Sequence, residues 1–299
     1  MNHKPWRKWL FIIIKVTVFI VACYFIYQVT QKNITALKSI EIENKFIFIS
    51  IFFITIITYI MLMMVLVFAW LVLLGFKEPQ RCAQIYFKSQ ILKYLPGNVF
   101  HFAYRHQQTK NEHFSHKQLG KVAVYEMIAL AISALLVVNL LFLWPNEVTW
   151  LTGWLVIPYW SVVLIEIAGL LIIFQLINNS GLLTIISCYL MYFFGMGLIT
   201  YLLIFVLGFE SQPYLYITAC FAASWLVGYI VPGAPGGTGV REMVFILLCT
   251  PKMEEYEALV IIALIRLISI LGETGMYFMA SKLSQPYRHF STWSDKTMP

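Results

Sequence analysis

The chain reads Tyr229-Ile-Val-Pro-Gly-Ala-Pro-Gly-Gly-Thr-Gly-Val-Arg-Glu242 between two strongly apolar segments. Proline has no amide hydrogen and glycine adds backbone freedom, so a helix is not expected to continue through residues 232–239. Irregular backbone at membrane depth is tolerated only where protein or a water-filled cavity surrounds it. This stretch therefore predicts a break at a functional site inside a membrane protein.

A similar break occurs in the first half of the chain, which reads Tyr94-Leu-Pro-Gly-Asn-Val-Phe-His-Phe-Ala-Tyr-Arg105. In both stretches a Pro-Gly pair is followed by an arginine nine positions after the proline, Pro96 to Arg105 and Pro232 to Arg241. Paired breaks at matching places in two halves indicate a transporter binding site. Only three positions match, so coincidence is the alternative.

The composition indicates a membrane protein that crosses the bilayer many times. Of 299 residues 60% are hydrophobic and 12% charged, and the mean hydropathy is +0.78. We therefore expect an all-α, polytopic transmembrane helical bundle. The net charge is +7, and the basic residues lie beside apolar segments. This placement favours a role in membrane orientation and in contact with anionic lipid headgroups over binding of nucleic acid. The five scattered cysteines show neither a disulfide framework nor zinc-ligand spacing, and we expect no metal or cofactor.

About eight crossings are expected. Residues 1–281 form one transmembrane domain, and residues 282–299 form a short polar tail. The predicted spans are 9–29 (an uncleaved first helix), 46–75, 122–143, 153–177, 182–207, 214–231, the broken segment 233–249, and 256–280. Residues 77–121 are rich in Lys and Arg, and the moderately apolar 85–104 within them favours an interfacial or re-entrant hairpin.

Charge sets the expected orientation. Eight crossings place fifteen Lys or Arg on one side and four on the other, which predicts cytoplasmic termini in a plasma membrane, unless the segment 233–249 is a hairpin and not a crossing. Both breaks then begin near the cytoplasmic side, although inverted repeats would place them at opposite faces. Either the halves are parallel or one break reaches the midplane.

Ionisable residues inside spans are costly and usually face a partner or a polar cavity. The candidates are Glu126, Glu166, Arg241, Glu242, Arg266 and Glu273. Arg266 and Glu273 lie two helical turns apart on one face, either as a structural pair or as part of a pathway. Arg105 and Arg241 each follow a break where a helix is expected to begin, which favours a phosphate site over interfacial anchoring.

Catalytic patterns are weak. The chain has a single aspartate, Asp295, whereas enzymes that transfer phosphoryl or glycosyl groups use acidic clusters. The cluster Glu254-Glu255-x-Glu257 is interpreted as a solvated helix cap. The Pro/Gly stretch lacks the Gly-Lys-Ser/Thr of a nucleotide-binding loop. We therefore predict a protein that is not an enzyme.

Several of these residues resemble the lysylphosphatidylglycerol synthase transmembrane, or flippase-like, family of bacterial and archaeal inner-membrane proteins. The resemblance rests on 93–97 with Arg105, on Tyr125-Glu126, on 231–242, and on Arg266 with Gly272. It covers most of the chain, but no synthase domain follows the last span. The resemblance implies translocation of lipid between leaflets, with substrates in the family that include aminoacylated phospholipid and polyprenyl-linked sugars.

The leading hypothesis is a lipid flippase in the bacterial inner membrane, with an amphiphilic, phosphate-bearing substrate. Arg105 and Arg241 would bind the phosphate, while Glu126 and Glu242 would balance those charges or recognise a cationic headgroup. The remaining predicted site residues are Pro232, Gly233, Gly236, Gly237, Gly239, Arg266 and Glu273, with the last three glycines admitting ligand close to the backbone. The alternatives are a polyprenyl-phosphate-dependent glycosyltransferase that uses Glu254 to Glu257, or a scaffold subunit. A homo-oligomer is compatible with the sequence.

Overall fold

The computed structural model describes residues 24–38, 44–94, 100–110, 113–143, 180–210, 212–231 and 235–283, with a few single residues between these ranges. The elements are α2 (Ile34–Lys38), α3 (Lys45–Leu73), α4 (Pro79–Gln90), η1 (Ile91–Tyr94), α5 (Phe100–Thr109), α6 (His116–Val138), η2 (Asn139–Leu143), α9 (Ser180–Val206), α10 (Tyr214–Ile230), η4 (Pro235–Gly237), α11 (Val240–Cys249) and α12 (Glu255–Leu283). The predicted all-α fold is confirmed for these ranges.

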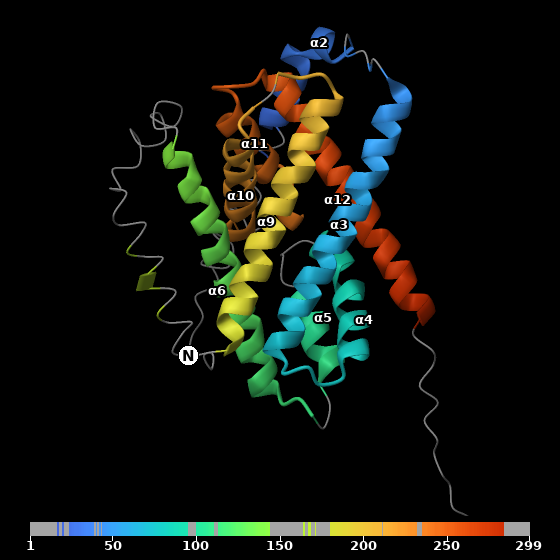
Figure 1. The fold of residues 1–299 in the computed structure, drawn as a ribbon, viewed down its shortest axis with the longest axis vertical. Coiled ribbons are helices and arrows are strands. Elements are labelled where there is room, and N and C mark those ends of the chain that lie inside the picture. The colour runs from blue at the N-terminus through green and yellow to red at the C-terminus, as the bar shows by residue number, and fades with distance from the viewer. Residues whose placement is uncertain are drawn as a thin grey trace, which may run out of the picture.

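Four of the helices are long and apolar enough to cross a membrane, and they form the bundle in Figure 1. They are Lys45–Leu73, His116–Leu143, Leu183–Val206 and Glu255–Lys282. Each exceeds the ~20 residues that a bilayer requires. A membrane protein is therefore confirmed, but a count of about eight crossings is not. The predicted span 9–29 lies outside the described residues except for 17, 20 and 24–29, and most of the span 153–177, including Glu166, and of the tail also lies outside them.

The outer surface of the bundle is apolar. On α3, Phe46, Phe53 and Met61 are 80%, 60% and 66% exposed, whereas Tyr59 and Leu62 on the opposite face are buried in the core. A soluble protein would not present such a continuous apolar surface to water. Lipid chains can cover such a surface. The helix is therefore apolar on both faces, one packed in the core and the other in contact with lipid.

Helix α9 packs most extensively against α3 and also contacts α6, α10 and α12. Two glycines permit this close approach. A Cβ atom added at Gly195 would lie 2.4 Å from Leu62 Cδ2, and one at Gly197 would lie 2.0 Å from Thr218 Oγ1. Small residues at such positions bring helix backbones together where lipid offers no hydrophobic driving force.

Helices α4 and α5 form a hairpin that enters the bundle from the lower end in Figure 1. Arg81 Nη2, near the start of α4, donates a hydrogen bond of 2.8 Å to the carbonyl of Gln108 near the end of α5. Between these points the chain passes through η1, which ends at Tyr94 just before the first Pro-Gly break. The hairpin predicted around residues 85–104 is confirmed.

Helices α10 and α11 form a second hairpin, which matches the hairpin alternative for residues 233–249 and does not support two successive crossings at 214–231 and 233–249. The start of α10 lies beside the end of α11, because the Tyr216 hydroxyl donates to the Leu248 carbonyl at 2.6 Å and Gln212 Nε2 donates to the Lys252 carbonyl at 2.6 Å. With 10 residues, α11 is about 15 Å long, half of the hydrocarbon thickness. Hydropathy alone does not distinguish such a half-length segment from a span.

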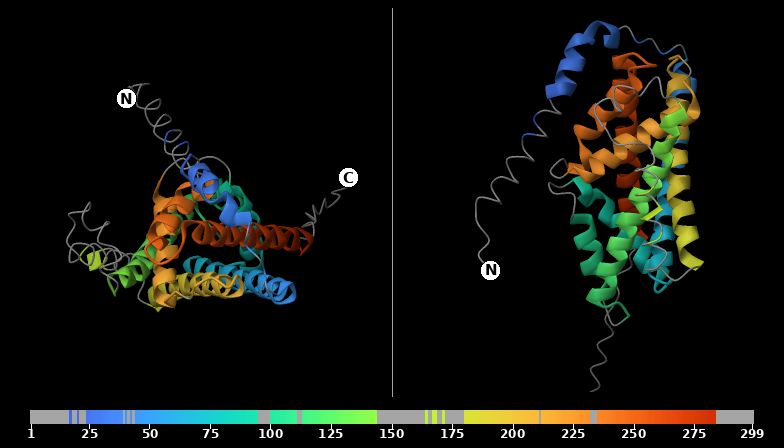
Figure 2. Two further views of the ribbon diagram at one scale, coloured as in Figure 1. Left: turned by 90° about the horizontal axis from the view of Figure 1, so that it is seen from above. Right: turned by 90° about the vertical axis from the view of Figure 1, so that its left-hand side faces the viewer.

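The two hairpins enter from opposite ends of the molecule and meet at their tips. Figure 1 shows α4 and α5 in the lower half and α10 and α11 in the upper half, and the right-hand view of Figure 2 shows the same separation. At the junction η1 contacts η4. The expectation that both breaks begin on one side assumed a full crossing at 214–231, whereas the α10–α11 hairpin returns the chain to the end from which it came.

The two ends of the molecule differ in charge. Lysines and arginines at the lower end outnumber the described acid there, Glu78; they are Lys77, Arg81, Lys110, Lys117, Lys121 and Lys282. At the upper end Lys32, Lys38, Lys45 and Lys252 are matched by Glu210, Glu254, Glu255 and Glu257. Since cytoplasmic loops carry the excess of Lys and Arg, we expect the lower end to face the cytoplasm.

This orientation is tested with two exposed positions, one at each end. In a cysteine-free background we expect His113→Cys to resist a membrane-impermeant maleimide in intact cells and Glu254→Cys to react with it. Permeabilised cells serve as the control, because both positions should then be labelled. Reaction at position 113 before permeabilisation would contradict the assignment.

Candidate functional site

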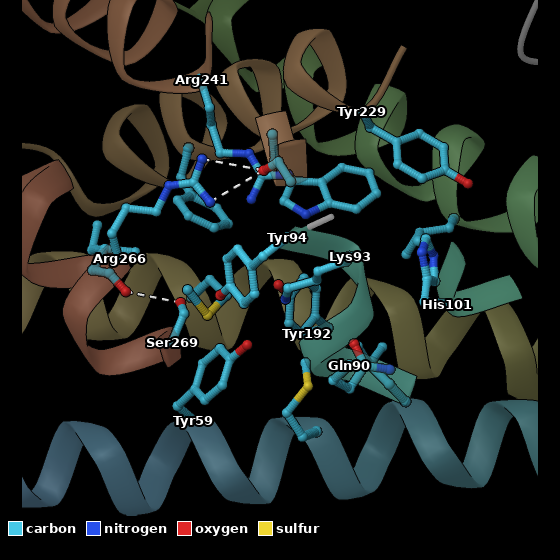
Figure 3. Close-up of a pocket in the computed structure, with 18 of the residues that line it drawn as sticks. Tyr59, Gln90, Lys93, Tyr94, His101, Tyr192, Tyr229, Arg241, Arg266 and Ser269 are labelled. Atoms are coloured by element: carbon cyan, nitrogen blue, oxygen red, sulfur yellow. Dashed lines mark hydrogen bonds between the residues drawn. The ribbon is translucent and has the colours of Figure 1, made fainter. Parts of the chain in front are cut away.

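A cavity of about 90 Å³ lies where the hairpin tips meet. Its walls come from both hairpins and from the surrounding helices α3, α6, α9 and α12, so segments far apart in sequence converge on it. Figure 3 shows Tyr94, Lys93 and His101 of the first hairpin facing Arg241 and Tyr229 of the second. The elements next to the two breaks, η1 before the first and η4 after the second Pro-Gly pair, are thus neighbours in space.

Arg266 of α12 holds the tip of the α10–α11 hairpin. Its Nη1 and Nη2 donate to the Gly236 carbonyl at 3.1 and 3.2 Å, and its Nε donates to Glu242 Oε1 at 2.5 Å. The other Glu242 oxygen accepts from the Gly239 amide at 2.6 Å. Because buried backbone polar groups require partners, this pair of charged side chains lets the helix break persist inside the bundle.

Glu273 of α12 holds the tip of the first hairpin in a comparable way. Its Oε1 accepts from the Lys93 ammonium group and from the Tyr59 hydroxyl. Glu273 is fully buried, at 0% exposure. An ionised carboxylate at such a position requires a charged partner, which Lys93 provides.

Arg105 and Glu126 form a third buried pair. Arg105 Nη1 lies 2.8 Å from Glu126 Oε1, and the two side chains are 4% and 6% exposed. The rings of Tyr86 and Phe102 surround the guanidinium, with centroids 4.6 and 4.9 Å from its carbon. Carboxylate and rings together therefore enclose most of this cation.

Arg241 differs from the other three cations around the cavity. Within the described residues it makes no hydrogen bond or ion pair, and its Nε is buried without a partner. Its guanidinium carbon lies 5.6 Å from the ring centroid of Trp225. Lys93, Arg241 and Arg266 are near enough to repel one another. In the described part of the chain four cations face three carboxylates here, and Arg241 is the cation that has no ion-pair partner of its own.

Gly236 and six charged residues among the predicted site residues line this cavity or make its supporting contacts: Arg105, Glu126, Arg241, Glu242, Arg266 and Glu273. Arg266 and Glu273 share a face of α12 as predicted, but they contact different hairpins rather than each other. Arg241 lies in the first turn of its helix, whereas Arg105 lies in the second turn of α5. Pro232 and Gly233 lie outside the described residues.

The glycines of the second break make close contacts within the protein, and Gly236 also lines the cavity, so their predicted approach to a ligand stays a prediction. The Gly236 carbonyl is occupied by Arg266, and the Gly239 amide is occupied by Glu242. Gly237 has φ +75°, and a Cβ atom there would lie 2.9 Å from the Gly228 carbonyl oxygen. These glycines therefore shape the tip and its packing on α10.

Sequence analysis missed Lys93, which it counted among the cytoplasmic charges. Lys93 instead points into the interior, as does Arg105 from the same segment, so both must be removed from the count of fifteen. Its position in the sequence could have indicated this role, because Lys93 lies three residues before Pro96 at a helix break.

The polar groups of Tyr94, His101 and Tyr229 were also missed. Each lines the cavity and has a buried polar atom without a hydrogen-bond partner.

The acidic cluster lies away from this cavity, at the start of α12. Glu255 forms an ion pair of 2.9 Å with Lys32, and Glu257 Oε2 accepts from the Glu254 amide at 3.2 Å. These contacts fit the interpretation as a helix cap. Across the described ranges, no group of three or more His, Cys, Asp or Glu is arranged to bind a metal ion.

Comparison of the chain with protein-family models, with curated proteins and with solved structures gives no match.

The Arg105–Glu126 pair provides a test of charge burial. Glu126→Gln leaves a buried guanidinium without its counter-charge, so we expect a loss of about 3–5 kcal/mol in stability. The double variant Arg105→Met/Glu126→Leu should recover most of the loss, since no unpaired charge remains. Thermal unfolding of the purified proteins in detergent measures both. A double variant no more stable than the single one would contradict the argument.

The packing of Gly237 is tested against Gly75, which has a similar φ of +68° but no atom within 4 Å of an added Cβ. Gly75→Ala should cost only the left-handed strain, about 1–2 kcal/mol. Gly237→Ala should cost about 1–3 kcal/mol more, because the new methyl group overpacks against α10. The melting temperatures of the two variants in detergent test this difference. Equal values would mean that the close approach of Gly237 to Gly228 does not limit the size of the side chain.

Proposed function

We propose that this protein is a lipid flippase or related transporter, which moves a phosphate-bearing lipid or a lipid-linked sugar between the leaflets of a bacterial inner membrane. The observation that carries the proposal is the uncompensated charge of Arg241 in a cavity between two opposed helix breaks. Membership of the flippase-like family suggested by the sequence motifs is part of this proposal.

The charge balance favours an anionic ligand. Each of the three carboxylates already pairs with a cation: Glu126 with Arg105, Glu242 with Arg266 and Glu273 with Lys93. A cationic headgroup would have to displace one of these partners, whereas an anion would meet a free guanidinium. Glu126 and Glu242 thus serve better as counter-charges than as sites for a cationic headgroup.

The position of Arg241 suits a phosphate. It lies in the first turn of α11, where the helix dipole is positive. A guanidinium can form two parallel hydrogen bonds with a phosphate. The unpaired polar atoms of Tyr94, His101 and Tyr229 supply further hydrogen-bonding groups around the cavity. Arg105, which already has a carboxylate partner, fits a structural role better than the phosphate role first expected of it.

The fold supports a lipid rather than a soluble anion as the ligand. The bundle around the cavity presents apolar side chains outward along α3, α9 and α12, including Phe53, Phe205 and Phe278. Half-length hairpins that meet inside a bundle are typical of transporters, in which binding sites lie at broken helices near the midplane. A polar cavity inside an apolar bundle can shield a headgroup from hydrocarbon during its passage.

The central test is Arg241→Ala in proteoliposomes that contain NBD-labelled phosphatidylglycerol, phosphatidylethanolamine or polyprenyl phosphate. Movement between leaflets is followed by dithionite quenching. We expect Arg241→Ala to abolish the movement that the unaltered protein catalyses, because loss of a charge-assisted hydrogen bond costs about 1.5–3 kcal/mol, or about 10- to 150-fold in affinity. Arg241→Lys should restore it in part, since an ammonium group lacks the bidentate geometry.

Lys282→Ala is the matched control, because this lysine lies at the lower end of α12, away from the cavity. It should leave both transport and protein yield unchanged. Normal transport by correctly inserted Arg241→Ala would exclude the phosphate role. Loss of the protein itself would instead indicate that Arg241 maintains the fold.

A further inference from the structure

An outward-facing apolar groove of about 410 Å³ lies where α3, α4 and α12 meet. Its apolar lining includes Ile60 and Met64 of α3, Ala83 and Phe87 of α4, and Met276 and Met279 of α12. Met64 and Met279 are 48% and 57% exposed, so the groove opens onto the surface that faces lipid. Flexible methionines suit a surface that accommodates a variable apolar chain.

The groove adjoins the polar cavity along all three helices. On α3, Tyr59 and Met63 line the cavity, while the neighbouring Ile60 and Met64 line the groove. On α12 the cavity reaches Ser269 and the groove begins at Met276. In the chain segment from α4 to η1, the groove ends at Phe87 and the cavity includes Lys93.

The partition between the two is a cluster of polar contacts. Glu273 lies on α12 between Ser269 and Met276, is fully buried, and accepts hydrogen bonds from Lys93 and Tyr59. Figure 3 shows Tyr59 rising from α3 toward the cavity, with Lys93 across from it. One carboxylate therefore separates a charged interior from an apolar groove that is open to the membrane.

We propose that the hydrocarbon chain of the transported lipid lies in this groove while its phosphate binds at Arg241, so that the Lys93–Glu273–Tyr59 cluster is the gate through which the headgroup enters. This inference rests on the proposed function. A phosphate lipid has a polar end and an apolar end, and burying the chain in a polar cavity would be unfavourable. Cavity and groove, side by side, offer each end its own environment.

The experiment fills the groove and leaves the cavity intact. Met64→Trp places a large side chain in the groove, and Met61→Trp places the same side chain on an exposed part of α3 that does not line it. Binding of dioleoyl phosphatidate and of glycerol 3-phosphate to the purified protein is measured by native mass spectrometry. Ala83→Trp fills the groove from α4 and serves as the second variant if Met64→Trp does not fold.

We expect Met64→Trp to weaken dioleoyl phosphatidate binding at least tenfold and to leave glycerol 3-phosphate binding unchanged, while Met61→Trp alters neither. Equal phosphatidate binding by Met64→Trp and Met61→Trp would overturn the proposal. A change from dimer to monomer without any change in lipid affinity would also overturn it, by identifying the groove as a contact between copies of this chain. Arg241→Ala separates the two proposals: it should weaken both ligands, and its failure to do so would count against the phosphate site while the groove variants still decide the chain site.

Discussion

The structure depends on satisfying the backbone where helices stop inside an apolar bundle. At the second break the Gly236 carbonyl accepts from Arg266 and the Gly239 amide donates to Glu242, and the two side chains pair with each other. Neither group could be left unpaired at this depth without a cost of about 1–3 kcal/mol or more. A single arginine on α12 thus permits the chain to turn back halfway through the bundle.

Helix α12 connects both hairpin tips through two charges seven residues apart. Arg266 contacts the upper hairpin and Glu273 contacts the lower one, about 10 Å apart along the helix axis. Most charged side chains at this junction therefore form ion pairs with one another. Among the described residues Arg241 is left without an ion pair, because Glu242 pairs with Arg266 and not with its own sequence neighbour.

Much of this arrangement could be predicted from the sequence, because its signals are local. Composition indicates a helical membrane protein, the Pro-Gly breaks mark the two tips, and isolated charges in apolar segments mark the site. The position of Arg241 at a helix start follows from the glycines before it. Which charged residues pair with each other could not be predicted from local signals. Lys93 pairs with Glu273, which is 180 residues away in sequence, and no residue near either one indicates the other as its partner. The count of about eight crossings is not confirmed for a related reason, since α10 is a short apolar helix that is followed by η4, which contacts η1 of the other hairpin.

Three cations converge on the junction between the hairpin tips. Among the described residues Lys93 and Arg266 have a carboxylate partner and Arg241 has none, so the like charges repel one another with incomplete compensation. An anion bound at Arg241 would remove this repulsion and add a contact shared by both hairpins. Any ligand that binds the folded state alone stabilises it by mass action. A phosphate headgroup would therefore do more than fill the cavity: by supplying the missing negative charge, it would strengthen the junction that links the two halves of the chain.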